Sequence, residues 1–118
     1  MSSSAPLTTS QWPDIATISA DVQAGKVTAT ELVNRALSSV DEKKEYNAVI
    51  VTVEDRAIER AKEIDKRVSA GEKIGRLAGV PFIAKDNFLT FGSETTAASN
   101  ILKGFEAPYQ ATVIERLE

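Results

Sequence analysis

Residues 48–84, AVIVTVEDRAIERAKEIDKRVSAGEKIGRLAGVPFIA, decide the fold class. The stretch opens with a short, β-branched apolar run over 48–53, which predicts a strand buried on both faces. Apolar residues then recur at helical spacing, which predicts a helix over 54–70. After a turn around Gly75, a second apolar run over 80–84 predicts another strand. Strands that alternate with helices are typical of an α/β layer fold with a parallel or mixed sheet.

Two leading helices are predicted before this stretch. The first covers residues 10–24, with Pro13 in its first turn and Gly25 as the left-handed residue after its end. The second begins at Thr28, because Thr28 and Glu31 have the spacing of a capping box. Further elements are expected after residue 84: an extended piece over 88–91, a helical turn within 95–102 and a helix over 111–118.

The predicted elements include only two or three strands, so the predicted sheet is small. A sheet buried on both faces needs more than two or three strands, and the last predicted helix has no C-cap signal. We therefore expect residues 9–118 to be the N-terminal portion of a larger domain that is incomplete at its C-terminus, preceded by a disordered polar tail over 1–8. The alternative is a complete small α/β domain, which would serve as a non-catalytic interaction domain.

Composition excludes several classes of function. The chain has 118 residues, of which 42% are hydrophobic and 26% are charged, as in an ordinary globular domain. It contains no Cys and no His. A disulfide framework, a thiolate zinc site, a cysteine nucleophile and an imidazole base are therefore excluded. Proton chemistry must use lysine, carboxylate, tyrosine or hydroxyl groups.

The net charge and the first residues of the chain indicate which partners and which cellular compartment to expect. The net charge is −3 and basic residues are scattered, so no nucleic-acid footprint is visible in this chain. No apolar run approaches the roughly 18 residues needed to cross a bilayer, and residues 1–6 lack the features of a secretory signal. We expect a cytoplasmic protein without a membrane partner.

Lys85 is the candidate base. It directly follows the predicted strand 80–84, and ligands in open α/β sheets bind beyond the carboxyl ends of the strands. Partial desolvation there would disfavour the ammonium form, and a neutral amine is a general base. The same pattern also fits an ordinary strand-end lysine that reaches solvent, paired with Asp86, and most lysines are of this kind.

Five spaced motifs carry a resemblance to a known family. They are 25–33 (GKVTATELV), 46–50 (YNAVI), 75–88 (GRLAGVPFIAKDNF), 95–102 (TTAASNIL) and 107–117 (APYQATVIERL). Together they resemble the amidase signature family, over nearly the whole chain from about residue 9. The resemblance implies an α/β/α fold with a mixed central sheet and a Ser–cis-Ser–Lys triad, in which Lys85 is the base that acts through a bridging serine.

The chain departs from the family pattern in one respect. The family's two serines lie in a Gly/Ser-rich segment downstream of the lysine motif, and no such segment occurs here. Ser93 and Ser99 are the only serines after Lys85, and neither lies in a Gly-rich loop. We therefore assign neither as nucleophile and expect the 118-residue chain alone to be inactive. The weaker candidates for substrate binding are Asp86, Asn87, Thr95 and Thr96, and no metal site is expected.

Within the family, the motifs look most like those of the tRNA-dependent amidotransferases. This implies a glutaminase subunit that passes ammonia to a B subunit, with a small C subunit completing a heterotrimer. The B subunit would act on misacylated Glu-tRNA(Gln) or Asp-tRNA(Asn). No phosphate-binding glycine loop is present, so ATP and Mg would be used in a partner subunit and not by this chain. A stand-alone amidase of the same family is the alternative enzyme.

Overall fold

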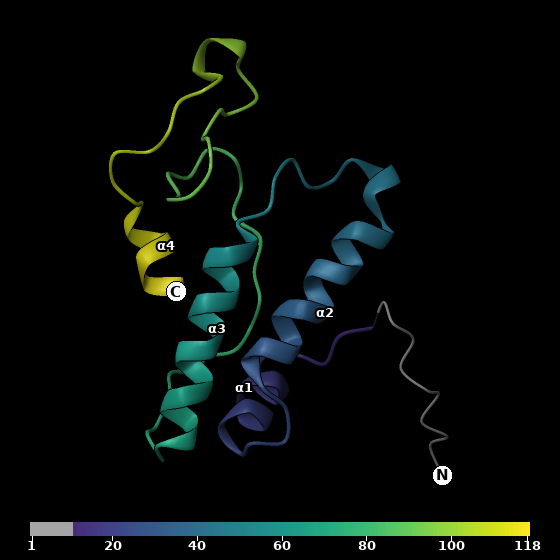
Figure 1. Ribbon diagram of the computed structural model, residues 1–118, viewed down its shortest axis with the longest axis vertical. Helices are drawn as coiled ribbons and strands as arrows, with labels where there is room; N and C mark the ends of the chain where they lie inside the picture. The colour runs from purple at the N-terminus through teal and green to yellow at the C-terminus, as the bar shows by residue number, and fades with distance from the viewer. Residues whose placement is uncertain (1–10) are drawn as a thin grey trace.

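The computed structural model describes residues 11–118, so the polar tail predicted over residues 1–8 lies outside the described residues. The described part is helical (Figure 1). Its elements are α1 (Ile15–Gln23), α2 (Ala29–Glu42), the 3-10 helix η1 (Lys44–Tyr46), α3 (Glu54–Ser69), the 3-10 helix η2 (Asn100–Leu102) and α4 (Thr112–Leu117). No helix within residues 11–118 is both long and apolar enough to span a bilayer.

Local capping explains where the first two helices begin. The predicted capping box of α2 is confirmed, because Thr28 N donates to Glu31 Oε2 at 2.9 Å and Glu31 N donates to Thr28 Oγ1 at 3.0 Å. The predicted start of α1 was too early. Asp14 is the N-cap and accepts from Thr17 N at 2.7 Å, so Pro13 lies just before the helix.

The core lies where three helices meet. α2 and α3 lie side by side, and α1 packs at one end of the pair (Figure 1). Asp65 of α3 joins the two long helices, because its carboxylate accepts from Ala29 N at 2.6 Å and Thr30 N at 3.1 Å. The buried apolar side chains of this core are Ile18, Val22, Ala29, Leu32, Ala61, Ile64 and Ile74. Ile114 of α4 is also buried but is not part of this cluster.

The predicted strands do not form within residues 11–118. Segments 48–53, 80–84 and 88–91 belong to no β-ladder, and the described residues hold only an isolated antiparallel bridge between Glu94 and Glu106. A strand requires a backbone partner, and neither long apolar segment has one here. Ile50 is 73% exposed and Ile83 is 75% exposed. The helices of the predicted α/β fold are therefore confirmed, whereas the mixed central sheet stays a prediction.

Candidate functional site

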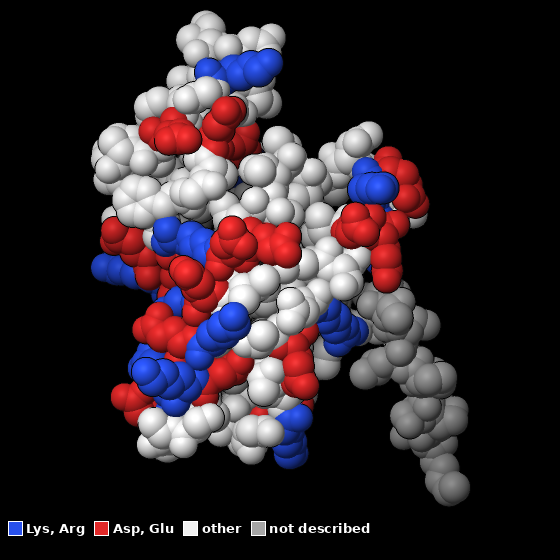
Figure 2. Space-filling model, viewed as in Figure 1, with Lys and Arg blue, Asp and Glu red and all other residues white. Residues whose placement is uncertain are grey.

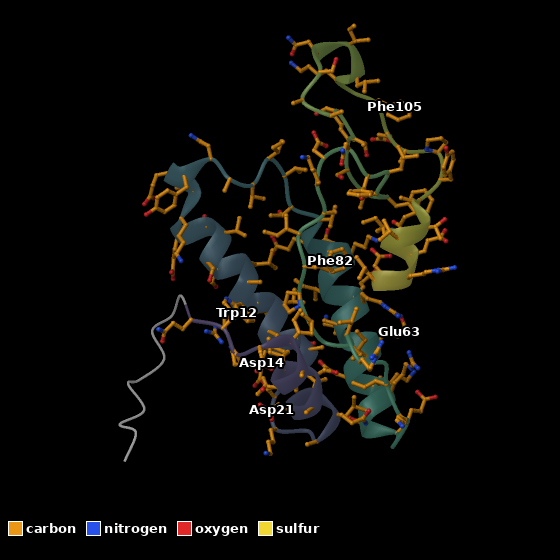
Figure 3. All side chains as sticks on the ribbon, turned by 180° about the vertical axis from the view of Figure 1, so that it is seen from behind. Trp12, Asp14, Asp21, Glu63, Phe82 and Phe105 are labelled. Carbon is orange, nitrogen blue, oxygen red and sulfur yellow. The ribbon has the colours of Figure 1, made fainter. Side chains whose placement is uncertain are left out.

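An apolar cavity of about 640 Å³ lies between the long helices and the two segments that were predicted as strands. Phe82 lies on the segment that follows α3 in the sequence and passes between α2 and α3 in space, whereas Phe105 lies in the outer loop after η2 (Figure 3). The wall is formed by side chains such as Val33 and Leu37 of α2 and Ala57 and Ile64 of α3. Lys85, Asp86 and Asn87 supply polar groups to the same wall.

Lys85 directly follows the second apolar segment, at the start of a turn. Phe88 N donates to Lys85 O at 3.0 Å and closes that turn. The lysine is exposed, so the partial desolvation expected from the sequence is not provided by residues 11–118. The expected pairing with Asp86 is also absent from the described residues, because the carboxylate of Asp86 is engaged elsewhere.

Asp86 is bonded to Thr96, ten residues further along the chain. Thr96 N donates to Asp86 Oδ1 at 3.1 Å, and the Thr96 hydroxyl donates to Asp86 Oδ2. Ala97 N also donates to the main-chain oxygen of Asp86, at 2.8 Å. The Thr96 hydroxyl, followed by the Thr96 N–H, lowers the pKa of the Asp86 carboxyl below its ordinary value. Two of the sequence candidates are thus brought together.

The remaining candidates lie close by in the chain but are not joined to this pair. Asn87 is exposed in the turn after Lys85 and lines the cavity. Thr95 is buried, lines the same cavity, and donates its N–H to Phe105 O at 2.9 Å. Ser93 also lines the cavity. Ser99 instead caps η2, because its hydroxyl oxygen accepts from Ile101 N at 3.3 Å.

Sequence reasoning missed a strained turn at the cavity wall. Ala97 and Ala98 have φ values of 49° and 58°, and Ser99 N donates to Thr96 O at 2.8 Å. Positive φ at both central residues of a turn normally calls for Asn or Gly. Because alanine does not indicate a positive φ, the sequence of this loop could not have predicted the turn. Both alanines line the cavity that Lys85 lines.

The chemistry of this site is that of a lysine amine at the edge of an apolar cavity. Lysine can transfer protons once its amine is neutral. Within residues 11–118, no group of three or more Asp or Glu side chains is arranged to hold a metal ion. No serine or threonine hydroxyl within residues 11–118 is hydrogen-bonded to the Lys85 amine.

Comparison with known proteins identifies the family. The sequence profile of the amidase family matches residues 31–118. The chain is 49% identical over 100 residues to the A subunit of mitochondrial glutamyl-tRNA(Gln) amidotransferase from Ornithorhynchus anatinus, which covers 85% of this chain and 19% of that protein. The human protein of the same name is 45% identical over the same shares. The Xenopus laevis protein is 47% identical over 81% of this chain and 18% of its own length.

The chain thus spans about a fifth of the length of the curated relatives that it matches. The matched residues nevertheless include every residue that lines the cavity except Ala29, and they include both Asp86 and Thr96. With its profile match over three quarters of the sequence, the chain belongs to the amidase family.

Proposed function

We propose that the chain supplies the catalytic lysine of a glutamine-hydrolysing amidotransferase subunit. The observation that carries this proposal is Lys85, which lines the apolar cavity immediately after the Gly-Val-Pro-Phe-Ile-Ala segment, 79–84. The relatives described above, at 45–49% identity, are all named as the A subunit of glutamyl-tRNA(Gln) amidotransferase. The alternative of a non-catalytic interaction domain receives no support from these names.

In the proposed reaction, Lys85 is the base and two serines outside this chain complete the triad. The Lys85 amine takes a proton from the bridging serine, which takes the proton of the nucleophilic serine. That serine attacks the side-chain amide carbon of glutamine, the carbon–nitrogen bond breaks, and ammonia leaves with the returned proton. Water then hydrolyses the acyl-enzyme ester to glutamate. The 118 residues alone are inactive in this scheme, because they hold only the base.

The fold and the assembly belong to the same proposal. Segments 48–53 and 80–84 become strands of a mixed central sheet when other strands of the domain pair with them. A B subunit receives the ammonia and acts on misacylated Glu-tRNA(Gln) or Asp-tRNA(Asn), using ATP and Mg, and a small C subunit completes a heterotrimer. The exposed apolar side chains of both segments support the proposal that further strands pair with them. The names of the relatives support the place in a multi-subunit enzyme.

The compartment needs its own test. The sequence predicts a cytoplasmic protein, and the relatives named above are mitochondrial by their printed names. Fractionation of the source cells with antibodies to this chain would distinguish the two locations.

Substitution of Lys85 tests the catalytic proposal in the full-length protein within its assembled complex. Lys85→Ala should abolish the release of glutamate from glutamine, because the base is lost. Lys85→Arg should be equally inactive, since guanidinium does not become neutral. Thermal denaturation of both variants would show whether the loss of turnover occurs in an intact fold.

Lys103→Ala is the matched control, because Lys103 is also an exposed loop lysine but does not line the cavity. It should keep wild-type turnover. Wild-type turnover in Lys85→Ala would refute the role of Lys85. Rapid hydrolysis of simple amides without the B and C subunits would instead favour a stand-alone amidase.

A further inference from the structure

We propose that Asp86, held by Thr96, is a positioning residue that fixes the direction from which the Lys85 side chain enters the site. This inference rests on the proposed function, because it assigns a task to the residue that follows the proposed base. Asp86 touches neither substrate nor reacting atoms in this scheme. It acts through the main chain that it shares with Lys85.

Four hydrogen bonds hold the main chain that follows Lys85. Two join the Asp86 carboxylate to the N–H and the hydroxyl of Thr96, and a third joins the Asp86 carbonyl to Ala97 N at 2.8 Å. The fourth closes the turn from Lys85 O to Phe88 N at 3.0 Å. Because three of the four bonds end at residues 96–97, the position of residue 86 depends on a segment ten residues away.

Lys85 needs such support from its backbone. Its side chain has a flexible four-carbon stem, and no hydrogen bond or ion pair to its amine is present within residues 11–118. A misplacement of about 1 Å can cost a reacting group about a hundredfold in rate. The anchor that the described residues give Lys85 is therefore the peptide unit between Lys85 and Asp86.

The strained turn next to Thr96 supports a functional origin for this arrangement. Ala97 and Ala98 both have positive φ, a conformation that is unfavourable for residues other than glycine. Strain of this kind persists where surrounding contacts over-determine the backbone, and it gathers at active sites. Here the bonds from Thr96 and Ala97 to Asp86 hold the turn, and both alanines line the same cavity as Lys85.

The test removes the Thr96 hydroxyl in the full-length protein within its assembled complex. Thr96→Val keeps the shape and the N–H but loses two bonds of the hydroxyl: the one that it donates to Asp86 Oδ2 and the one that it accepts from Ala98 N at 3.3 Å. We expect kcat for glutamine hydrolysis to fall by at least about tenfold with KM within about twofold, because the base is misaligned while substrate contacts are unchanged. Thr96→Ser keeps a hydroxyl and should restore kcat to within about threefold of wild type.

Thr30→Val is a matched control elsewhere in the fold. The Thr30 hydroxyl donates to Asp65 Oδ2 at 2.6 Å, so this change also removes a threonine-to-aspartate bond, but at the start of α2 and away from Lys85. It should lower stability and leave kcat unchanged. A purely structural role for Thr96 would give the same result as Thr30→Val.

The outcomes separate this inference from the proposed function. An active Lys85→Ala variant would refute the proposed function itself. An inactive Lys85→Ala variant together with wild-type kcat in Thr96→Val would overturn only the positioning role. If Thr96→Val does not fold, Thr96→Ala removes the same hydroxyl, together with the threonine methyl group, and adds no group in their place. Wild-type kcat in that variant would overturn the inference equally.

Discussion

At the scale of single residues, both the backbone conformation at position 79 and the space around it favour glycine. Its φ is +83°, and a Cβ atom built there would lie 2.7 Å from Cγ2 of Val22, a side chain that is 1% exposed. We predict that Gly79→Ala destabilises the protein by about 2–4 kcal/mol, combining left-handed strain with overpacking of the core. Chemical denaturation of the full-length protein would measure the loss.

Gly104→Ala separates the two causes. Gly104 has almost the same φ, +85°, but an added Cβ would meet nothing within 4 Å. This variant should lose only the strain of about 1–2 kcal/mol. Equal losses in the two variants would show that the contact with Val22 contributes nothing to the stability difference.

The candidate site could be predicted residue by residue only in part. The sequence places Lys85, Asp86 and Asn87 together because they are consecutive and follow an apolar segment, and all three line the cavity. It proposed Thr96 as a neighbour of the site, but it could not show that Thr96 binds Asp86. That bond depends on how an irregular loop of ten residues folds back, and no periodic pattern encodes such a path.

At the scale of helices, one carboxylate joins α2 to α3 in addition to their apolar contact. Asp65 of α3 accepts hydrogen bonds from Ala29 N, Thr30 N and the Thr30 hydroxyl, which are groups in the first turn of α2. These N–H groups have no partner within their own helix. We predict that Asp65→Ala costs about 1–3 kcal/mol, because it leaves partly buried donors unsatisfied. Thermal denaturation of the full-length protein would measure the loss.

Asp55→Ala is the control for this prediction. Asp55 is an exposed acidic residue in the first turn of α3, so its removal loses only a favourable interaction with the helix dipole, about 0.3–1 kcal/mol. A loss at Asp65 no greater than that at Asp55 would contradict the proposed bridge between the two helices.

Helices and strands differed in how far the sequence could predict them. The start of α2 and the two ends of α3 were predicted closely, because signals such as the Thr28 and Glu31 capping box act on neighbours within a few residues. The apolar segments 48–53 and 80–84 have strand composition, but a strand is completed by hydrogen bonds to another segment. Within residues 11–118 neither segment has a strand partner. Both segments therefore have the composition of a strand but do not form one.

At the scale of the whole molecule, residues 11–118 leave large apolar side chains exposed. Ile50 is 73% exposed, Ile83 is 75% exposed and Phe82 is 44% exposed. Charged side chains gather over α3, whereas the surface between α2 and α3 is mainly uncharged (Figure 2). Ile50 and Ile83 stand on the two apolar segments beside the cavity. Exposed apolar surface of this kind drives association.

We therefore predict that the 118 residues, expressed alone, self-associate and melt without a sharp cooperative transition. Replacing Ile50 and Ile83 together with lysine should reduce association, because both side chains border the apolar cavity. Ile101→Lys is the control, since Ile101 is 92% exposed but lies outside that cavity. Sedimentation velocity would measure the assembly state. A monomer with a sharp two-state melt would contradict the prediction, because it would show that these apolar segments need no covering partner.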